Sequence, residues 1–175
     1  VAFADVGDTL TVRRAAETSL TVRGPRADGV PTDGTNSIQA AADLMGLTAA
    51  FVLDKELPTA AGIGGGTSDA AAALRALASL YHEAMPREVD ALTLGADVPV
   101  CLSPVAQRMR GVGEILDPVP GLPEIPAILV NPGYPISTGR IFTSLVSKTN
   151  PPMPTELPHF CSIQDLCLWL GAQRN

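Results

Sequence analysis

The sequence predicts an α+β fold, because strand-like and helix-like segments are mixed along it without an internal repeat. Three observations carry this prediction. Residues 1–24 alternate apolar and polar side chains, residues 68–82 place leucines along one helical stripe, and stretches rich in Gly and Pro, such as residues 24–34, separate the segments. Only 4% of the residues are aromatic, so the core must consist mainly of Ala, Val, Leu and Ile.

The first segments predict an antiparallel hairpin, a helix and a strand. The hairpin places Leu10 and Val12 opposite Leu20 and Val22, around a polar turn at residues 15–19. Either Thr35 or Asn36 can cap the helix, which then runs to Met45 with Gly46 as its C′ residue. Residues 48–55 form the following strand.

Later segments predict more helices than strands. The helix over residues 68–82 has its apolar stripe facing the core and Arg75 on its outer face. The other predicted elements are a short helix over 86–94, a strand entered through the turn at residues 94–97 and running to Leu102, strands over 112–116 and 127–130, a helix capped by Ser137 or Thr138 and ending at Val146, a surface loop over 148–158, and a last helix over 163–170.

Composition limits the class of protein. The 175 residues suffice for one domain, or for one domain and part of a second, and the formal net charge of -6 argues against nucleic acid as the main partner. No apolar run reaches about 18 residues, so no membrane span is predicted. Three cysteines without a CxxC pair favour reduced thiols in the cytoplasm.

A glycine-rich stretch from Leu57 to Ala71 is the main candidate for a binding site. Three consecutive glycines are followed by Thr67, Ser68 and Asp69 and then by alanines. A strand, a glycine loop and a helix start together present free N–H groups and a positive dipole end to an anion such as phosphate. The Walker pattern is excluded because no Lys follows Gly66, and the Rossmann pattern because Thr67 occupies its third glycine position. The alternative is a tight turn without a ligand.

Asp97 is the candidate base. It lies between Gly95-Ala96 and Val98-Pro99, at the start of the predicted apolar strand, where partial desolvation favours a basic carboxylate. Its alternative role is a cap or turn hydrogen bond. Lys55 either offsets phosphate charge or is a solvated residue at a strand end, while His82 and His159 are expected at the surface.

The run from Lys55 to Ala71 resembles the phosphate-binding motif of the galactokinase, homoserine kinase, mevalonate kinase and phosphomevalonate kinase superfamily. Within it, the resemblance is to the family that phosphorylates 4-diphosphocytidyl-2-C-methyl-D-erythritol. The supporting motifs follow the family's order, namely Phe3 to Asp8, Asn36 at its helix, Leu94 to Pro99, Gly111 to Glu114, Leu129 to Pro132, and Ser137-Thr138 with Phe142.

The resemblance implies a cytoplasmic kinase of the non-mevalonate route to isoprenoid (terpenoid) precursors, which uses ATP with magnesium to phosphorylate the 2-hydroxyl of that small molecule. Asp97 matches the catalytic base, and Thr138 and Phe142 match positions around the cytidine end. No magnesium ligand is assigned. The implied ATP-binding residues are Asn36, Pro58, Thr59, Ala60, Ala61, Gly62, Ile63, Gly64, Gly65, Gly66, Thr67 and Ser68.

The resemblance also implies a fold and its limits. Residues 1–125 are expected to form a domain like domain 2 of ribosomal protein S5, and residues 126–175 the start of a ferredoxin-like domain. The family's opening strand, with a catalytic Lys, a nearby Asn and a Gly-Tyr-His segment, has no counterpart here, so truncation at both ends is expected. The alternatives are an ATP-binding fragment without catalysis, a related kinase for another small alcohol, and an S5-like domain that contacts RNA.

Overall fold

The computed structural model describes residues 1–131, 133, 138–147, 149, 151–154 and 156–173. The chain divides into two compact units, Val1–Pro118 and Val119–Asn175. Both α-helices and β-strands are present, which confirms the predicted α+β class. The expected limits of the kinase domains, 1–125 and 126–175, stay a prediction.

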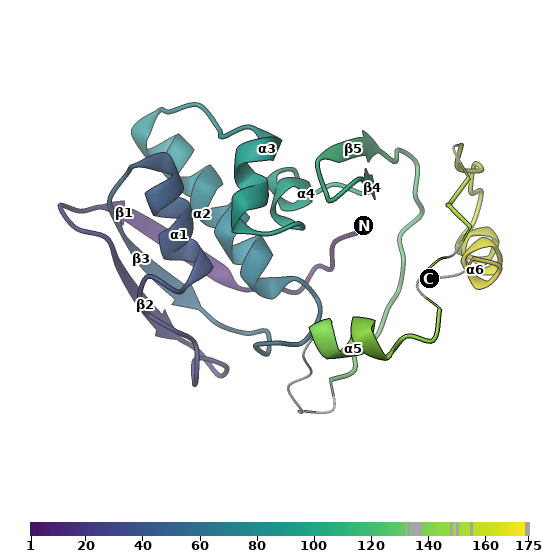
Figure 1. Ribbon diagram of the computed structural model, residues 1–175, viewed down its shortest axis with the longest axis horizontal. Helices are drawn as coiled ribbons and strands as arrows, with labels where there is room; N and C mark the ends of the chain where they lie inside the picture. Colours follow the sequence, from purple (N-terminus) through teal and green to yellow (C-terminus); the bar gives the residue numbers. More distant parts are fainter. Residues whose placement is uncertain (132, 134–137, 148, 150, 155, 174–175) are drawn as a thin grey trace. The chain divides into compact units, whose positions relative to one another are not determined.

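The first unit contains a three-stranded sheet in the order β1-β3-β2, formed by Thr9–Arg14, Ala49–Asp54 and Ser19–Arg23 (Figure 1). β1 is antiparallel to β3, whereas β2 is parallel to it. The predicted hairpin of β1 and β2 is therefore wrong, because β3 lies between them. The reason is burial: β3 is buried or half-buried throughout, as a central strand must be.

The predicted alternation of side chains is confirmed, although the strand order is not. Phe51 of β3 is opposite Val12 of β1 and Leu20 of β2, and Leu53 is opposite Leu10 and Val22. These side chains lie on one face of the sheet and join the hydrophobic core. Thr9, Thr11, Ser19 and Thr21 occupy the alternate positions and are exposed.

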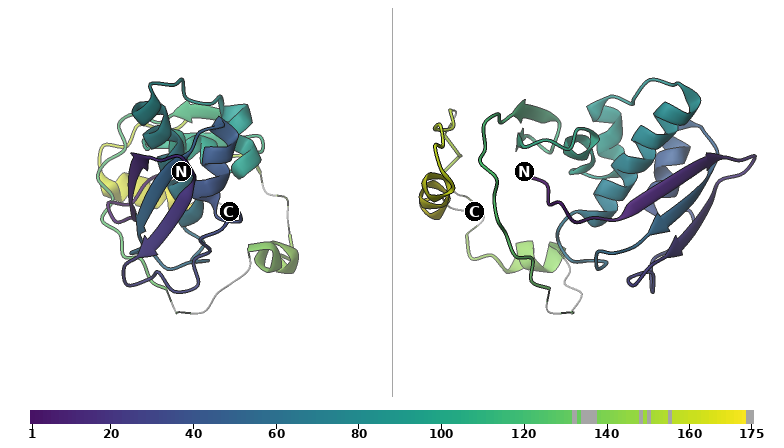
Figure 2. Two further views of the ribbon diagram at one scale, coloured as in Figure 1. Left: turned by 90° about the vertical axis from the view of Figure 1, so that its left-hand side faces the viewer. Right: turned by 180° about the vertical axis from the view of Figure 1, so that it is seen from behind.

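Helices α1 (Ser37–Met45) and α2 (Gly65–Tyr81) lie side by side over the apolar face of the sheet (Figures 1 and 2). The predicted caps of α1 are confirmed: the Asn36 side chain accepts a hydrogen bond from the Ile38 amide, and Gly46 takes the left-handed conformation with φ +64°. Leu74 and Leu77 of α2 are fully buried against the sheet and α1.

Beyond α2 the chain forms α3 (Glu88–Ala91), a 3-10 turn (Leu92–Leu94) and α4 (Val98–Leu102). The strand predicted up to Leu102 is therefore wrong. A short apolar run cannot be assigned to helix or strand by periodicity. Pro99 suits the first turn of α4, where its missing N–H is not needed, and α4 packs against α2.

A second, two-stranded sheet ends the first unit. β4 (Gln107–Arg110) pairs antiparallel with β5 (Ile115–Pro118). The strand predicted over 112–116 is thus partly wrong, because residues 111–114 form the turn of this hairpin and β4 was not predicted. Glu114 accepts the Val112 amide within this turn, which stabilises it.

The second unit contains α5 (Thr138–Ser144) and α6 (Ile163–Gly171), close to two predicted helices. Ser137, one of the predicted caps of α5, lies outside the described residues. Residues 127–130 form no strand, contrary to the prediction; Ile128 is 89% exposed and Val130 86%, and a strand needs a hydrogen-bonded neighbour. Across the residues described, no helix is both long and apolar enough to span a membrane.

Candidate active site

The glycine loop connects the end of β3 to the start of α2. Gly62 and Gly64 have φ values of +74° and +73°, a conformation that glycine adopts without steric cost. Gly64 is the N-cap of α2, and its carbonyl accepts hydrogen bonds from the Thr67 hydroxyl at 2.7 Å and from the Ser68 amide at 2.9 Å. The loop therefore delivers the chain directly into the helix.

Gly65 and Gly66 belong to the first turn of α2, so the helix begins three residues before the predicted Ser68. In a first turn the N–H groups have no intrahelical acceptor, and the dipole end carries positive charge. The amides of Gly65, Gly66 and Thr67 thus form the helix end that suits a phosphate.

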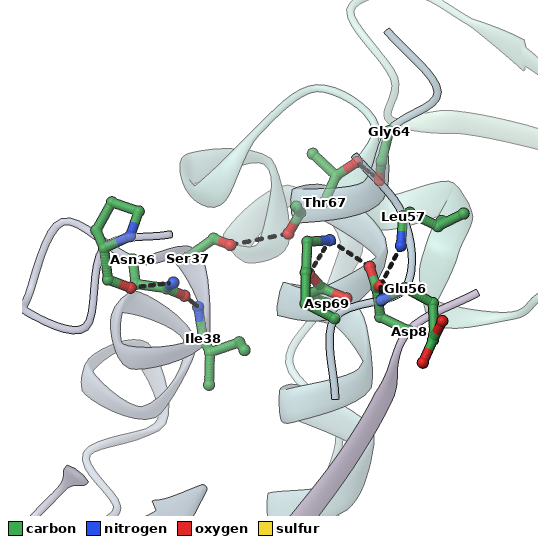
Figure 3. Close-up of polar contacts among 12 residues, drawn as sticks. Asp8, Asn36, Ser37, Ile38, Glu56, Leu57, Gly64, Thr67 and Asp69 are labelled. Carbon is green, nitrogen blue, oxygen red and sulfur yellow. Dashed lines mark hydrogen bonds and ion pairs between the residues drawn. The ribbon is translucent and has the colours of Figure 1, made fainter. Parts of the chain in front are cut away.

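The N-terminus of α1 lies beside that of α2 (Figure 3). The Ser37 hydroxyl donates to the Gly66 carbonyl at 2.8 Å and joins the two helix ends. The Asn36 side chain accepts from the Ile38 amide at 2.9 Å and donates to the Pro31 carbonyl at 2.7 Å. Asn36 is buried and acts as a cap in this structure, while its contact with adenine stays a prediction.

Lys55 is not the solvated residue at a strand end that was one of its two expected roles, whereas its effect on phosphate charge stays a prediction. Its side chain is 4% exposed and forms ion pairs with Asp8 and with Asp69, the latter at 3.4 Å. Burial raises the pKa of Asp69 to about 6, and the negative charge of Asp8 adds to this rise, while Lys55 opposes it. Lys55 is thus a buried, paired residue and is neither a solvated nor a free cation.

Asp8 and Asp69 were missed as site residues by the sequence analysis. Both lie within the motifs that carry the resemblance, in the Phe3 to Asp8 segment and just after Ser68. No local pattern indicates that they share Lys55, since Asp8 is separated from Lys55 by 47 positions along the chain.

Asp97 precedes α4 and is exposed, so the expected desolvation at a strand end is not found. Its segment nevertheless lies against the glycine loop. A Cβ placed on Gly95 would lie 3.3 Å from the Thr67 methyl group, and one on Gly113 only 2.1 Å from the Ala96 carbonyl oxygen. Residues 95–97 are therefore confined between the first turn of α2 and the β4–β5 turn, with the carboxylate of Asp97 accessible.

Two contacts hold α4 against α2 just behind this segment. The hydroxyl of Ser68 is 3.5 Å from the Cys101 sulfur, and the Arg75 guanidinium donates to the Cys101 carbonyl at 2.5 Å. Arg75 therefore packs against α4 and does not occupy the outer face predicted for it. Burial raises the pKa of the Cys101 thiol, and the thiol stays neutral near pH 7.

The predicted cytidine-side residues lie in the second unit. Thr138 is the first residue of α5, and Phe142 of the same helix is 61% exposed. Their role stays a prediction. Among the residues that the structure describes, no three His, Cys, Asp or Glu side chains form a group that could hold a metal ion.

The segment that contains the two helix N-termini and Asp97 is similar to a known family of kinases. Residues 36–104, which include both helix N-termini and Asp97, match the family model described as the GHMP kinases N terminal domain. The resemblance to this kinase superfamily, expected from the glycine motif, is confirmed.

Individual relatives of this chain bear the name of one particular kinase. The whole chain is 53% identical to a 4-diphosphocytidyl-2-C-methyl-D-erythritol kinase of Dinoroseobacter shibae and 49% identical to that of Ruegeria pomeroyi. It spans 61% and 63% of the lengths of these two relatives. A crystal structure of a 4-(cytidine 5'-diphospho)-2C-methyl-D-erythritol kinase matches with 36% identity and a TM-score of 0.62, covering 78% of this chain and 50% of that one.

Proposed function

We propose that this chain is part of a kinase that transfers the γ-phosphoryl group of ATP to the 2-hydroxyl of 4-diphosphocytidyl-2-C-methyl-D-erythritol. The activity belongs to the non-mevalonate route to isoprenoid precursors, in the cytoplasm. The observation that carries the proposal is the free N-terminus of α2 behind the glycine loop, inside a segment that matches a kinase domain. Relatives of about half-identical sequence bear the name of this kinase and support the choice of substrate.

The phosphates are the part of ATP for which the structure offers the clearest partner. The amides of Gly65, Gly66 and Thr67 have no intrahelical acceptor at the start of α2, and residues 58–64 lead directly into this helix end. Phosphoryl transfer depends mainly on positioning and on neutralising charge. Ser68, in the first turns of α2, is the residue whose hydroxyl would hold magnesium beside the phosphates, and the ion would neutralise their charge.

Asp97 is the proposed base for the substrate hydroxyl. An exposed carboxylate without a hydrogen bond to its own helix is available to an incoming hydroxyl group. Asn36 would contact adenine from the start of α1, and Thr138 and Phe142 the cytidine end. The finer fold is proposed with the function: a domain like S5 domain 2 over residues 1–125 and the start of a ferredoxin-like domain over 126–175.

A substrate comparison tests this function. ADP release from magnesium-ATP is measured for the full-length kinase that contains this chain, with the cytidine diphosphate substrate, mevalonate or homoserine as the alcohol. We expect turnover with the first alcohol alone. Turnover with mevalonate or homoserine instead would assign the chain to another kinase of the superfamily.

A second candidate function is ATP binding without catalysis. It is favoured by the engagement of Lys55, whose ammonium is paired with Asp8 and Asp69 and so is not available to phosphate. Calorimetric binding of ATP by the 175-residue chain, with no ADP formed in the presence of the alcohol, would support this candidate for the chain alone.

A further inference from the structure

Three charged side chains are buried together beneath the glycine loop. They come from three separate parts of the chain: the segment before β1, the residue after β3 and the second turn of α2. The side chain of Lys55 is 4% exposed, that of Asp8 2% and that of Asp69 11%, so all three are largely shielded from solvent. A group of buried charges is costly unless its members are paired and hydrogen-bonded, and here each one is.

Asp8 binds the entrance of the glycine loop. Its Oδ1 atom accepts the amides of Glu56 at 2.7 Å and Leu57 at 2.9 Å, and its Oδ2 atom accepts the Lys55 ammonium (Figure 3). Two backbone amides on one carboxylate oxygen fix the direction in which the chain leaves β3. Such charge-assisted bonds are among the stronger hydrogen bonds in proteins.

Lys55 connects this entrance to the other end of the loop. Its backbone amide donates to the Arg23 carbonyl at 2.7 Å, so its own position is set by β2. Its ammonium reaches Asp69 at 3.4 Å, and a Cβ on Gly65 would lie 3.6 Å from the same nitrogen. The ammonium therefore lies directly against the first residue of α2.

We propose that Asp8 is a positioning residue for nucleotide binding: with Lys55 and Asp69 it fixes both ends of the glycine loop and so holds the helix N-terminus ready for phosphate. The inference rests on the proposed function, because it assumes that the loop binds ATP. It assigns a role to a residue outside the glycine motif and outside the segment that matches the kinase domain, residues 36–104.

Four versions of the 175-residue chain test the proposal: unchanged, Asp8→Ala, Asp8→Asn and, as a control, Asp54→Asn. Asp54 also pairs with a basic residue, Arg23, but at the exposed surface next to Lys55. Asn at position 8 retains an oxygen that can accept the two amides, whereas Ala does not. Amide hydrogen exchange reports the loop, and calorimetric titration with magnesium-ATP reports binding.

Asp8→Ala removes the acceptor of the Glu56 and Leu57 amides and of the Lys55 ammonium. We expect it to speed exchange at Glu56 and Leu57 and to weaken ATP binding about tenfold or more. Asp8→Asn should restore slow exchange and most of the affinity, and Asp54→Asn should behave like the unchanged chain. The proposal is overturned if Asp8→Ala leaves the loop and the affinity unchanged. It is overturned equally if exchange rises evenly through the first unit and Asp8→Asn does not rescue it.

Two other results have their own interpretation, namely a lack of ATP binding by the unchanged chain and a failure of Asp8→Ala to fold. If the unchanged chain binds no ATP, the proposed function fails, while exchange at Glu56 and Leu57 still decides whether Asp8 fixes the loop. If Asp8→Ala does not fold, Asp69→Asn replaces it, since this change removes only the 3.4 Å pair. Faster exchange of the Ser68 amide with unchanged Glu56 and Leu57 is then expected, and unchanged exchange at Ser68 contradicts the proposal.

Discussion

The two sides of the glycine loop carry carboxylates in opposite environments. Beneath the loop, Asp8 and Asp69 are buried and share Lys55. Beside it, Asp97 is exposed, and its side chain makes no capping bond to α4. Paired, buried carboxylates set the position of a backbone, whereas an accessible carboxylate can exchange a proton with a bound hydroxyl.

This difference separates a structural role from a chemical one within a single site. Residues 95–97 are placed by packing: Gly95 lies against Thr67, and Gly113 against Ala96. The carboxylate of Asp97 can therefore be changed without loss of its surroundings. Changes at Asp8 or Asp69, in contrast, alter the loop itself.

Of the changes proposed, Asp97→Asn should have the largest effect on turnover. In the full-length kinase we expect turnover to fall by roughly 10²–10⁴-fold, the usual contribution of a general base. The affinity for ATP and the melting temperature should stay close to those of the unchanged enzyme, because Asp97 is exposed. Steady-state kinetics with calorimetry and thermal melts measure these quantities. Near-normal turnover would exclude Asp97 as the base.

Asp69→Asn tests the burial of Asp69 through the pH dependence of stability. Burial raises the pKa of Asp69 to about 6. Between about pH 4 and pH 6 the carboxyl group of Asp69 therefore holds its proton in the folded chain but has lost it in the unfolded chain. The stability from this residue is thus fully present below about pH 4, the ordinary Asp pKa, and is lost as the pH rises through 6.

The measurement is the free energy of unfolding of the unchanged chain minus that of Asp69→Asn, from urea titrations between pH 4 and pH 7. We expect this difference to fall as the pH rises, by at most about 3 kcal/mol, because the shift is roughly two pKa units. Other carboxylates largely cancel in the difference. A difference that is constant or rises with pH would show that Asp69 is not desolvated.

Gly113→Ala tests the packing that places Asp97. Its φ is +139°, and an added Cβ would lie 2.1 Å from the Ala96 carbonyl oxygen, which must shift. We expect a loss of about 1–3 kcal/mol and slower turnover. Gly121→Ala is the control, since Gly121 also has a positive φ of +75° but has nothing within 4 Å of an added Cβ. Equal effects of the two changes would mean that the contact with Ala96 is unimportant.

The parts of the fold that depend on local signals were predictable. Asn36 and Gly46 end α1 as expected, because caps are set by a few neighbouring residues. The insertion of β3 between β1 and β2 was not, since strand pairing depends on distant burial. The short apolar run of α4 is ambiguous in period, and its assignment as a strand failed for that reason.

In the candidate site, too, the features set by local sequence were predictable and those set by distant contacts were not. The glycine loop and Asp97 were found because their residue types and order form a motif. The role of Lys55 was not found, because its burial depends on Asp8 far along the chain and on Gly24. An added Cβ on Gly24 would lie 2.7 Å from the Lys55 carbonyl oxygen, and such a close approach leaves no pattern in the sequence.

The proposed site for the phosphates of ATP is the N-terminus of α2 with its glycine loop. Calorimetric titration of the 175-residue chain with magnesium-ATP tests it directly, with Gly64→Ala as the variant and Gly121→Ala as the control. At Gly64, φ is +73°, which strains an alanine, and an added Cβ would lie 3.2 Å from the Thr67 hydroxyl oxygen, so this hydroxyl must give way by a few tenths of an ångström. We predict one ATP bound per chain, with affinity weakened about tenfold or more by Gly64→Ala and unchanged by Gly121→Ala. Absence of binding, or equal affinity in all three chains, would contradict this assignment.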